Sequence, residues 1–145
     1  MSDAGFHVRP ARLDDRDLIW LLTQQFATSF EPERAAFDSA YASLVGRPDT
    51  FMAVAELSSA GIAGYTLASS HLTLFANGPV AWVEELMVSP DWRRGGVGAS
   101  LMQAAEQWAQ AQGAVYLALA TRRAADFYQA IGYTESASFF RRILG

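Results

Sequence analysis

A glycine-rich segment with two arginines, Arg93-Arg94-Gly95-Gly96-Val97-Gly98-Ala99, has residue types and spacing that could bind a ligand. It follows a predicted strand and opens a predicted helix, where glycines let main-chain N–H groups approach a ligand closely. The free amides of a helix's first turn and the positive end of its dipole attract anions. A diphosphate fits this environment, and an ordinary strand-to-helix turn beside two solvated arginines is the alternative.

Two known phosphate-binding patterns are excluded for this segment. The dinucleotide fingerprint needs glycines in the spacing G-x-G-x-x-G and an acidic residue about 20 positions later. The Walker A loop ends in Gly-Lys-Ser or Gly-Lys-Thr, and all eleven cationic side chains of this chain are arginine. The segment therefore predicts a different kind of anion site.

Glu84 and Glu85 form the second group of residues that could do chemistry. Successive side chains of a strand point to opposite faces, so we expect one of these carboxylates to face a ligand. A primary ammonium group, with a pKa near ~10.4, becomes a nucleophile only after a base removes its proton. One glutamate could be that base, or both could be structural or bind a cationic substrate without taking part in catalysis.

The composition narrows the remaining classes of function. The chain has 145 residues and no cysteine, which excludes disulfides, thiolate zinc sites and a cysteine nucleophile. Its two histidines, His7 and His71, lie far apart in the sequence, so we expect no metal site. A net charge of −4 argues against a nucleic-acid-binding face, and no apolar run is long enough to span a membrane. We expect a single cytoplasmic domain over residues 1–145.

The elements that must position these residues follow from hydrophobic periodicity. A short strand at 6–8 precedes a helix that we expect Asp14 to cap, with Leu18, Leu21, Leu22 and Phe26 on its apolar face. A second helix is predicted from Pro32 to Gly46. Strands are predicted at 51–57, 62–74 and 80–88, a helix from the glycine-rich segment to Gln112, a strand at 115–120, a helix around 124–131 and a last strand at 133–144. This order predicts a mixed α/β domain with a parallel strand pair around the crossover helix.

In its context, the glycine-rich segment resembles the acyl-CoA signature of the GNAT superfamily of N-acetyltransferases. The pattern Arg93-x-x-Gly96-x-Gly98 is preceded by Leu86-Met87-Val88-Ser89-Pro90, and Phe127-Tyr128 precedes Gly132-Tyr133, as in that family. The resemblance covers about 83–133. It implies a mixed, mostly antiparallel central sheet with a parallel strand pair at the cofactor cleft, flanked by about four helices. Thr121 departs from the pattern, since many members carry asparagine there.

The resemblance also implies a role for each matching residue. Main-chain amides from Arg94 to Ala99, with Arg93, would hold the pyrophosphate of CoA. The main chain of Leu86, Met87 and Val88 would pair with the pantetheine arm, and an N–H near Val88 could stabilise the oxyanion. Glu84 would be the base, with Glu85 as second choice, and Tyr128 would protonate the departing thiolate. Tyr128 as a core aromatic is the alternative to that last role.

The resemblance thus implies an N-acetyltransferase that uses acetyl-CoA as cosubstrate, needs no metal and acts by direct attack in a ternary complex, since no cysteine is present. A small-molecule amine is the expected acceptor, recognised by residues around 30–41 and 75–79. Two other functions stay open: a non-catalytic module that binds or senses acyl-CoA, and an acetyltransferase that acts on a protein N-terminus. A homodimer is a further expectation from the resemblance.

Overall fold

A five-stranded sheet in the order β1-β2-β3-β4-β5 forms the centre of the computed structural model, which describes residues 5–26 and 30–145. The strands are β1 (Phe6–Pro10), β2 (Thr50–Leu57), β3 (Ile62–Leu72), β4 (Pro79–Val88) and β5 (Leu117–Leu119). Neighbours among the first four strands are antiparallel, whereas β5 is parallel to β4. The mixed, mostly antiparallel sheet with one parallel pair is therefore confirmed.

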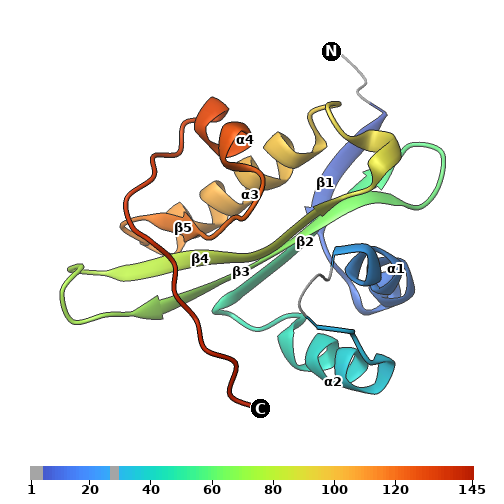
Figure 1. Ribbon diagram of the computed structural model, residues 1–145. Coiled ribbons are helices and arrows are strands. Elements are labelled where there is room, and N and C mark those ends of the chain that lie inside the picture. Colours follow the sequence, from blue (N-terminus) through green and yellow to red (C-terminus); the bar gives the residue numbers. More distant parts are fainter. Residues whose placement is uncertain (1–4, 27–29) are drawn as a thin grey trace.

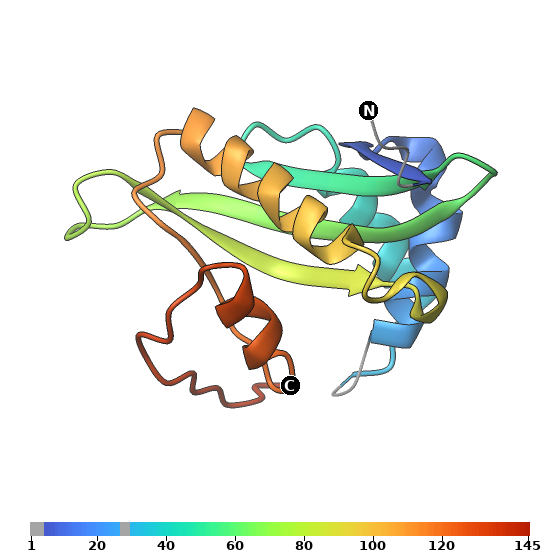
Figure 2. The same cartoon turned by 90° about the horizontal axis from the view of Figure 1, so that it is seen from above.

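The described residues form four α-helices, which pack around the sheet (Figures 1 and 2). α1 (Arg16–Phe26) and α2 (Arg34–Leu44) lie on one face, α3 (Val97–Ala111) crosses the other, and α4 (Ala125–Ala130) follows β5. Two short 3-10 turns, η1 (Leu13–Asp15) and η2 (Pro90–Trp92), precede α1 and the glycine-rich segment respectively. None of the helices in these described parts of the chain is long and apolar enough to cross a membrane.

The two faces of the sheet bury separate clusters of side chains. On the α3 side, Leu101 and Met102 are fully buried, and small strand residues such as Ala63 and Ala68 let the helix lie close to the sheet. On the other side, Ile19 of α1 and Tyr41 of α2 pack against strand residues that include Val54, Tyr65 and Met87. The sheet is thus held between helices, and the ends of β4 and β5 carry the candidate site.

The start of α1 differs from the prediction. A 3-10 turn precedes the helix, and Asp15 rather than Asp14 accepts a main-chain bond, from Arg12 N at 2.7 Å. The Asp15 carboxylate also receives two hydrogen bonds from the Arg9 guanidinium, at 2.8 and 2.9 Å, and this pair fixes where the helix begins. Of the predicted apolar face, Leu22 is buried but Leu18 and Leu21 are 40% and 56% exposed, because the apolar stripe is wider than the contact with the sheet.

The predicted last strand at 133–144 is wrong, because this segment is irregular. Figure 1 shows it leaving α4 and running past β5 and β4 to the C-terminus. Among the described residues, none of the main-chain hydrogen bonds outside helices and strands involves 134–145. Its large side chains come in pairs, Phe139-Phe140, Arg141-Arg142 and Ile143-Leu144, so neither face of a strand would be uniformly apolar. The apolar pairs are exposed instead.

Candidate active site

The turn between η2 and α3 contains the glycine-rich segment, and its main chain is unusual. Gly96 has a φ of +88° and Arg94 a φ of +67°, both in the left-handed region. α3 begins at Val97, and the first amide that bonds back into this helix is that of Ser100, to Gly96 O at 3.0 Å. The amides of Val97, Gly98 and Ala99 therefore belong to the free first turn of a fifteen-residue helix, which favours a bound anion.

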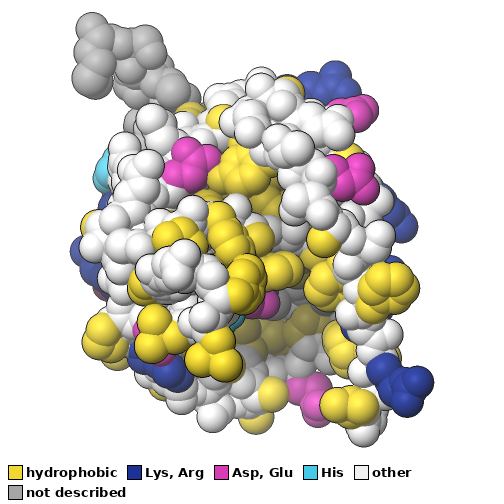
Figure 3. All heavy atoms as spheres, turned by 90° about the vertical axis from the view of Figure 1, so that its left-hand side faces the viewer, with side chains coloured by type: hydrophobic (Ala, Val, Ile, Leu, Met, Phe, Trp, Pro, Cys, Tyr) yellow, Lys and Arg dark blue, Asp and Glu magenta, His cyan; other side chains and the backbone are white. Residues whose placement is uncertain are grey.

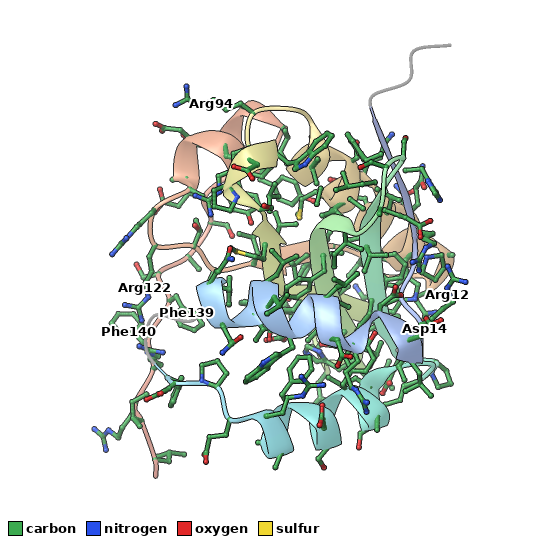
Figure 4. All side chains as sticks on the ribbon, turned by 90° about the vertical axis from the view of Figure 1, so that its right-hand side faces the viewer. Arg12, Asp14, Arg94, Arg122, Phe139 and Phe140 are labelled. Atoms are coloured by element: carbon green, nitrogen blue, oxygen red, sulfur yellow. The ribbon has the colours of Figure 1, made fainter. Side chains whose placement is uncertain are left out.

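The two arginines of this turn play different parts. Arg93 Nε donates to Val88 O at 3.2 Å and so ties the turn to the end of β4. Arg94 lies at the outer edge of the molecule and points away from its body (Figure 4). Gly98 brings the turn next to α4, since a Cβ built at Gly98 would lie 3.1 Å from Phe127 Cζ. The segment predicted to bind the cofactor is therefore adjacent to the residue that precedes Tyr128.

The outer edge of β4 beyond Val83 has no strand partner in the described part of the chain. β4 pairs with β5 only through Ala81, Trp82 and Val83, so the two strands separate before Leu86. On its other edge β4 continues to pair with β3, where Leu86 is opposite Thr66 and Val88 opposite Gly64. The main chain at Leu86, Met87 and Val88 thus offers one free edge to an extended ligand.

A bulge in β4 lies at Glu84, so the regular alternation of faces that the sequence predicts for Glu84 and Glu85 is interrupted there. The register of β4 against β3 shifts between Leu67 and Ala68, and Glu84 is the residue left without a partner. Such a bulge interrupts the alternation of side chains. Val83 packs toward α3, Glu85 bonds to Tyr65 on the α1 side, and Glu84 and Glu85 both line one large cavity.

This cavity has a volume of about 1830 Å³ and lies between β5, α4, the end of α1 and the C-terminal segment. Figure 3 shows hydrophobic side chains gathered around the hollow on this side of the molecule. Phe30, Pro32 and Phe75 line it, as expected for an acceptor pocket built from residues around 30–41 and 75–79. The sequence did not indicate that the C-terminal segment would form part of its wall.

Tyr128 of α4 lines the same cavity as Glu84 and Glu85. Its ring packs edge-on against Phe127 and Tyr133, with centroids 4.9 and 6.0 Å away. Burial raises the pKa of the Tyr128 phenol, so this hydroxyl keeps its proton at neutral pH. The structure therefore brings together both predicted catalytic residues. The ten predicted cofactor residues, Leu86–Val88 and Arg93–Ala99, do not line this cavity and lie along β4 and the following turn.

Thr121, which departs from the family pattern, also lines the cavity. Its Oγ1 accepts a hydrogen bond from the main-chain N of Ala124 at 3.1 Å, just before α4 begins. The side chain thus organises the turn that carries α4 and Tyr128.

Two residues of the site were missed by the sequence analysis. The Tyr65 hydroxyl donates to Glu85 Oε1 at 2.7 Å and accepts a hydrogen bond from Thr23 Oγ1 at 3.1 Å. Burial and the neighbouring Glu85 charge raise the pKa of this phenol. Tyr65 belongs to no motif, and only the register of β3 against β4 reveals that it lies beside a carboxylate. Within the described residues, no group of three or more His, Asp or Glu is arranged to hold a metal.

Comparisons with known proteins agree with this arrangement. The model of the Acetyltransferase (GNAT) family matches residues 16–133. A curated relative, the aminoglycoside N(6')-acetyltransferase type 1 of Acinetobacter genomosp. 13, is 36% identical over 73 residues, which are 46% of this chain and 50% of the relative. The chain thus matches about half the length of that relative.

Solved structures share the fold over nearly the whole chain. A glucosamine-6-phosphate N-acetyltransferase from Arabidopsis thaliana superposes with a TM-score of 0.82 at 18% identity, covering 97% of this chain and 99% of its own. An aminoglycoside antibiotic 6'-N-acetyltransferase from Acinetobacter baumannii gives 0.79 at 20% identity, covering 97% and 100%. At these identities the likeness is one of fold.

Proposed function

Since the chain belongs to the acetyltransferase (GNAT) family, we propose that it transfers an acetyl group from acetyl-CoA to the amine of a small molecule. One observation carries the proposal: two carboxylates and a tyrosine line a single cavity beside the free edge of β4. One domain over residues 1–145, located in the cytoplasm, carries the activity.

Acetyl-CoA would bind along β4 and the turn before α3. The amides from Arg94 to Ala99 and the positive end of the α3 dipole hold the pyrophosphate. The free main-chain edge at Leu86, Met87 and Val88 pairs with the pantetheine arm. The thioester would then lie along the second half of β4, between Glu84 and Val88, with an N–H close to Val88 available for the oxyanion.

The transfer itself needs one base and one acid. Glu84 takes a proton from the acceptor ammonium, the amine nitrogen attacks the thioester carbon, and the C–S bond breaks. Burial raises the pKa of the Tyr128 phenol, which gives its proton to the departing thiolate sulfur. The second proton that the nitrogen loses as the amide forms restores this phenol, and Glu84 releases the first proton to solvent. The chain contains no cysteine that could carry the acetyl group, so both substrates are bound together.

A cationic amine is the acceptor that this cavity favours. Four carboxylates, those of Glu84, Glu85, Glu106 and Glu135, line it against two guanidinium groups, those of Arg122 and Arg141, and this acidic excess attracts amines that carry positive charge. The curated relative is an aminoglycoside acetyltransferase, so amino sugars with several ammonium groups are the first acceptors to test.

The test combines binding and turnover. Acetyl-CoA and CoA, but not ATP, should raise the melting temperature, since a ligand at 100 times its dissociation constant stabilises by ~2.7 kcal/mol. Thiol release with a panel of aminoglycosides, polyamines and simple amines then measures transfer, without background from protein thiols because the chain has no cysteine.

Glu84→Gln should lower kcat by about 10² or more while the KM of acetyl-CoA changes little. An unchanged rate and pH profile would remove Glu84 as the base. No thermal shift with either CoA species would contradict the proposed function as a whole.

We also propose a homodimer. The apolar pairs of the C-terminal segment, Phe139-Phe140 and Ile143-Leu144, are exposed, and a second copy of the chain would cover them.

A further inference from the structure

Glu84 and Glu85 are identical in chemistry and adjacent in sequence, but their surroundings differ. Glu84 sits in the bulge of β4, its side chain is exposed, and no hydrogen bond or ion pair joins it to another residue in the described parts of the chain. Glu85 is half-buried and accepts a hydrogen bond from the Tyr65 hydroxyl at 2.7 Å. One carboxylate is free to move, and its neighbour has a fixed direction.

The group that fixes Glu85 is itself held on both sides. Tyr65 is only 4% exposed, and its ring packs in the cluster that includes Ile19 and Met87. Its hydroxyl oxygen accepts a hydrogen bond from Thr23 Oγ1 of α1 at 3.1 Å, so its own proton is directed to Glu85 Oε1. The chain of contacts Thr23 to Tyr65 to Glu85 thus connects α1 with the carboxylate.

Glu85 stands between two cavities. It lines the large cavity that also contains Glu84 and Tyr128, and it lines a second one of about 90 Å³ beneath α1 and α2, together with Thr23, Tyr65 and Tyr41. The bond to Tyr65 occupies Oε1 on the buried side. No other side-chain hydrogen bond to Glu85 is present among the described residues, so its second oxygen can accept one from a ligand.

We propose that Tyr65 is a positioning residue that locks Glu85 as the binding site for a second ammonium group of the acceptor, while Glu84 takes the proton from the ammonium that reacts. Tyr65 acts only through Glu85, and Thr23 supports it from α1. This inference rests on the proposed function. It specifies that function further, since the preferred acceptor then carries at least two ammonium groups.

Physical chemistry favours this division of roles. A hydrogen bond to a charged group is among the stronger ones in proteins, and a carboxylate held in one direction binds a cation with little loss of side-chain entropy. A base must approach the proton that it removes and then release it, which suits the mobile Glu84. Tyr65 takes no part in the proton transfer itself. Burial and the Glu85 charge raise the pKa of its phenol, which therefore keeps its proton.

The experiment compares Tyr65→Phe with Tyr41→Phe in the full chain. Tyr41 is a matched control, because it is 3% exposed, lies on the same side of the sheet, and donates its hydroxyl proton to a main-chain oxygen, that of Arg12. It ends the segment 30–41 that was expected to recognise the acceptor, but it lines only the small cavity and not the large one. Each variant is assayed by thiol release with acceptors in pairs, 1,5-diaminopentane against pentylamine, and with an aminoglycoside. Melting temperatures confirm that both variants are folded.

For Tyr65→Phe we expect the KM of the diamine and of the aminoglycoside to rise by about 10-fold or more, while kcat and the KM of pentylamine change less than about 3-fold. Tyr41→Phe should leave kcat and the KM of all three acceptors near the wild-type values. Thr23→Val should act in the same direction as Tyr65→Phe, with a smaller change.

A double variant shows whether Tyr65 acts through Glu85. If it does, Tyr65→Phe combined with Glu85→Gln raises the KM of the diamine no further than Glu85→Gln alone. The inference is overturned if the increases in KM from the two single variants multiply in the double variant. It is also overturned if Tyr65→Phe raises the KM of the diamine and of the monoamine equally. Either result leaves the proposed function standing. No turnover of any amine by the wild type overturns the proposed function and this inference with it.

Discussion

At the scale of single residues, neighbours distant in sequence decide what a side chain can do. Tyr65 is 20 positions from Glu85, and its hydroxyl distinguishes that carboxylate from Glu84. Asp15, in contrast, is bound by partners that are close in sequence, the Arg9 guanidinium and the main-chain N of Arg12, and it is only 5% exposed.

We expect Tyr128→Phe to lower kcat by about 10², the usual contribution of a positioned acid, with the KM of acetyl-CoA nearly unchanged. Burial raises the pKa of Tyr128, so the wild type should keep this contribution through neutral and mildly alkaline pH. Steady-state kinetics from pH 6 to 9 test this. Tyr133→Phe is the control, since that ring packs beside Tyr128 but its hydroxyl donates to Glu106 at 2.6 Å. Equal rates in Tyr128→Phe and the wild type would mean that Tyr128 is a packing residue.

Asp15→Asn should reduce the free energy of unfolding at pH 7 by about 3 kcal/mol, because it leaves Arg9 without its buried partner. Hydrogen bonding from Arg9 lowers the pKa of Asp15 below its ordinary value. A lowered folded pKa means that the stabilisation is present above pH ~4 and is lost as the pH falls through the folded pKa. In urea unfolding, the free energies of wild type and variant should therefore converge as the pH falls through the lowered pKa of Asp15. Asp49→Asn, in an exposed pair with Arg47, should leave the free energy of unfolding nearly unchanged.

At this scale the sequence predicts part of the site. Arg93, the glycines, Glu84 and Tyr128 follow from a motif with fixed spacing, and the structure brings Glu84 and Tyr128 to one cavity. Tyr65 and Thr23 could not be predicted, because their roles depend on contacts across strands and between a helix and the sheet.

At the scale of elements, the close approach of β3 to β4 depends on Gly64. A Cβ there would lie 2.5 Å from the main-chain oxygen of Met87 and 3.2 Å from Val88 Cα, so one strand would have to move. This is the part of β4 that we propose to bind the pantetheine arm.

Gly64→Ala should therefore destabilise the fold by about 1–3 kcal/mol and raise the KM of acetyl-CoA. Gly95→Ala is the control for stability, since its Cβ would approach nothing closer than Trp92 O at 3.4 Å. Urea unfolding without ligand compares the two. A Gly64→Ala variant as stable as the Gly95→Ala variant would show that β3 and β4 can separate freely there.

The elements themselves were largely predictable. Apolar periodicity gave α2, α3 and the first four strands to within a few residues, since these segments each bury a regular face. Periodicity could not reveal the bulge at Glu84, because one extra residue changes the phase of a strand without changing its composition. It also failed for 133–144, where apolar residues are present but a partner strand is not.

At the scale of the whole molecule, the C-terminal segment carries exposed apolar side chains. Phe139 and Phe140, labelled in Figure 4, have 62% and 88% of their surfaces exposed, and Phe139 also lines the large cavity. Apolar side chains exposed in a group mark a surface where another molecule binds.

If a second copy covers them, light scattering after size exclusion should give about twice the chain mass of 15.8 kDa. A chain shortened to end at Ser138 should give the monomer mass and keep a cooperative thermal transition, because the removed residues are exposed. A full-length chain that is monomeric at all accessible concentrations would contradict the homodimer.

The bulge gives β4 one residue more than the part of β3 with which it pairs. Ten residues of β4 face nine of β3, and Glu84 is the surplus one. Without it, Val83 would be followed directly by Glu85, and every later side chain of the strand would keep its present face in plain alternation. The sheet would therefore be complete, and more regular, without Glu84. Because the pairing of the strands does not require Glu84, a variant that lacks this residue should still fold. It should lose only the activity that depends on the cavity.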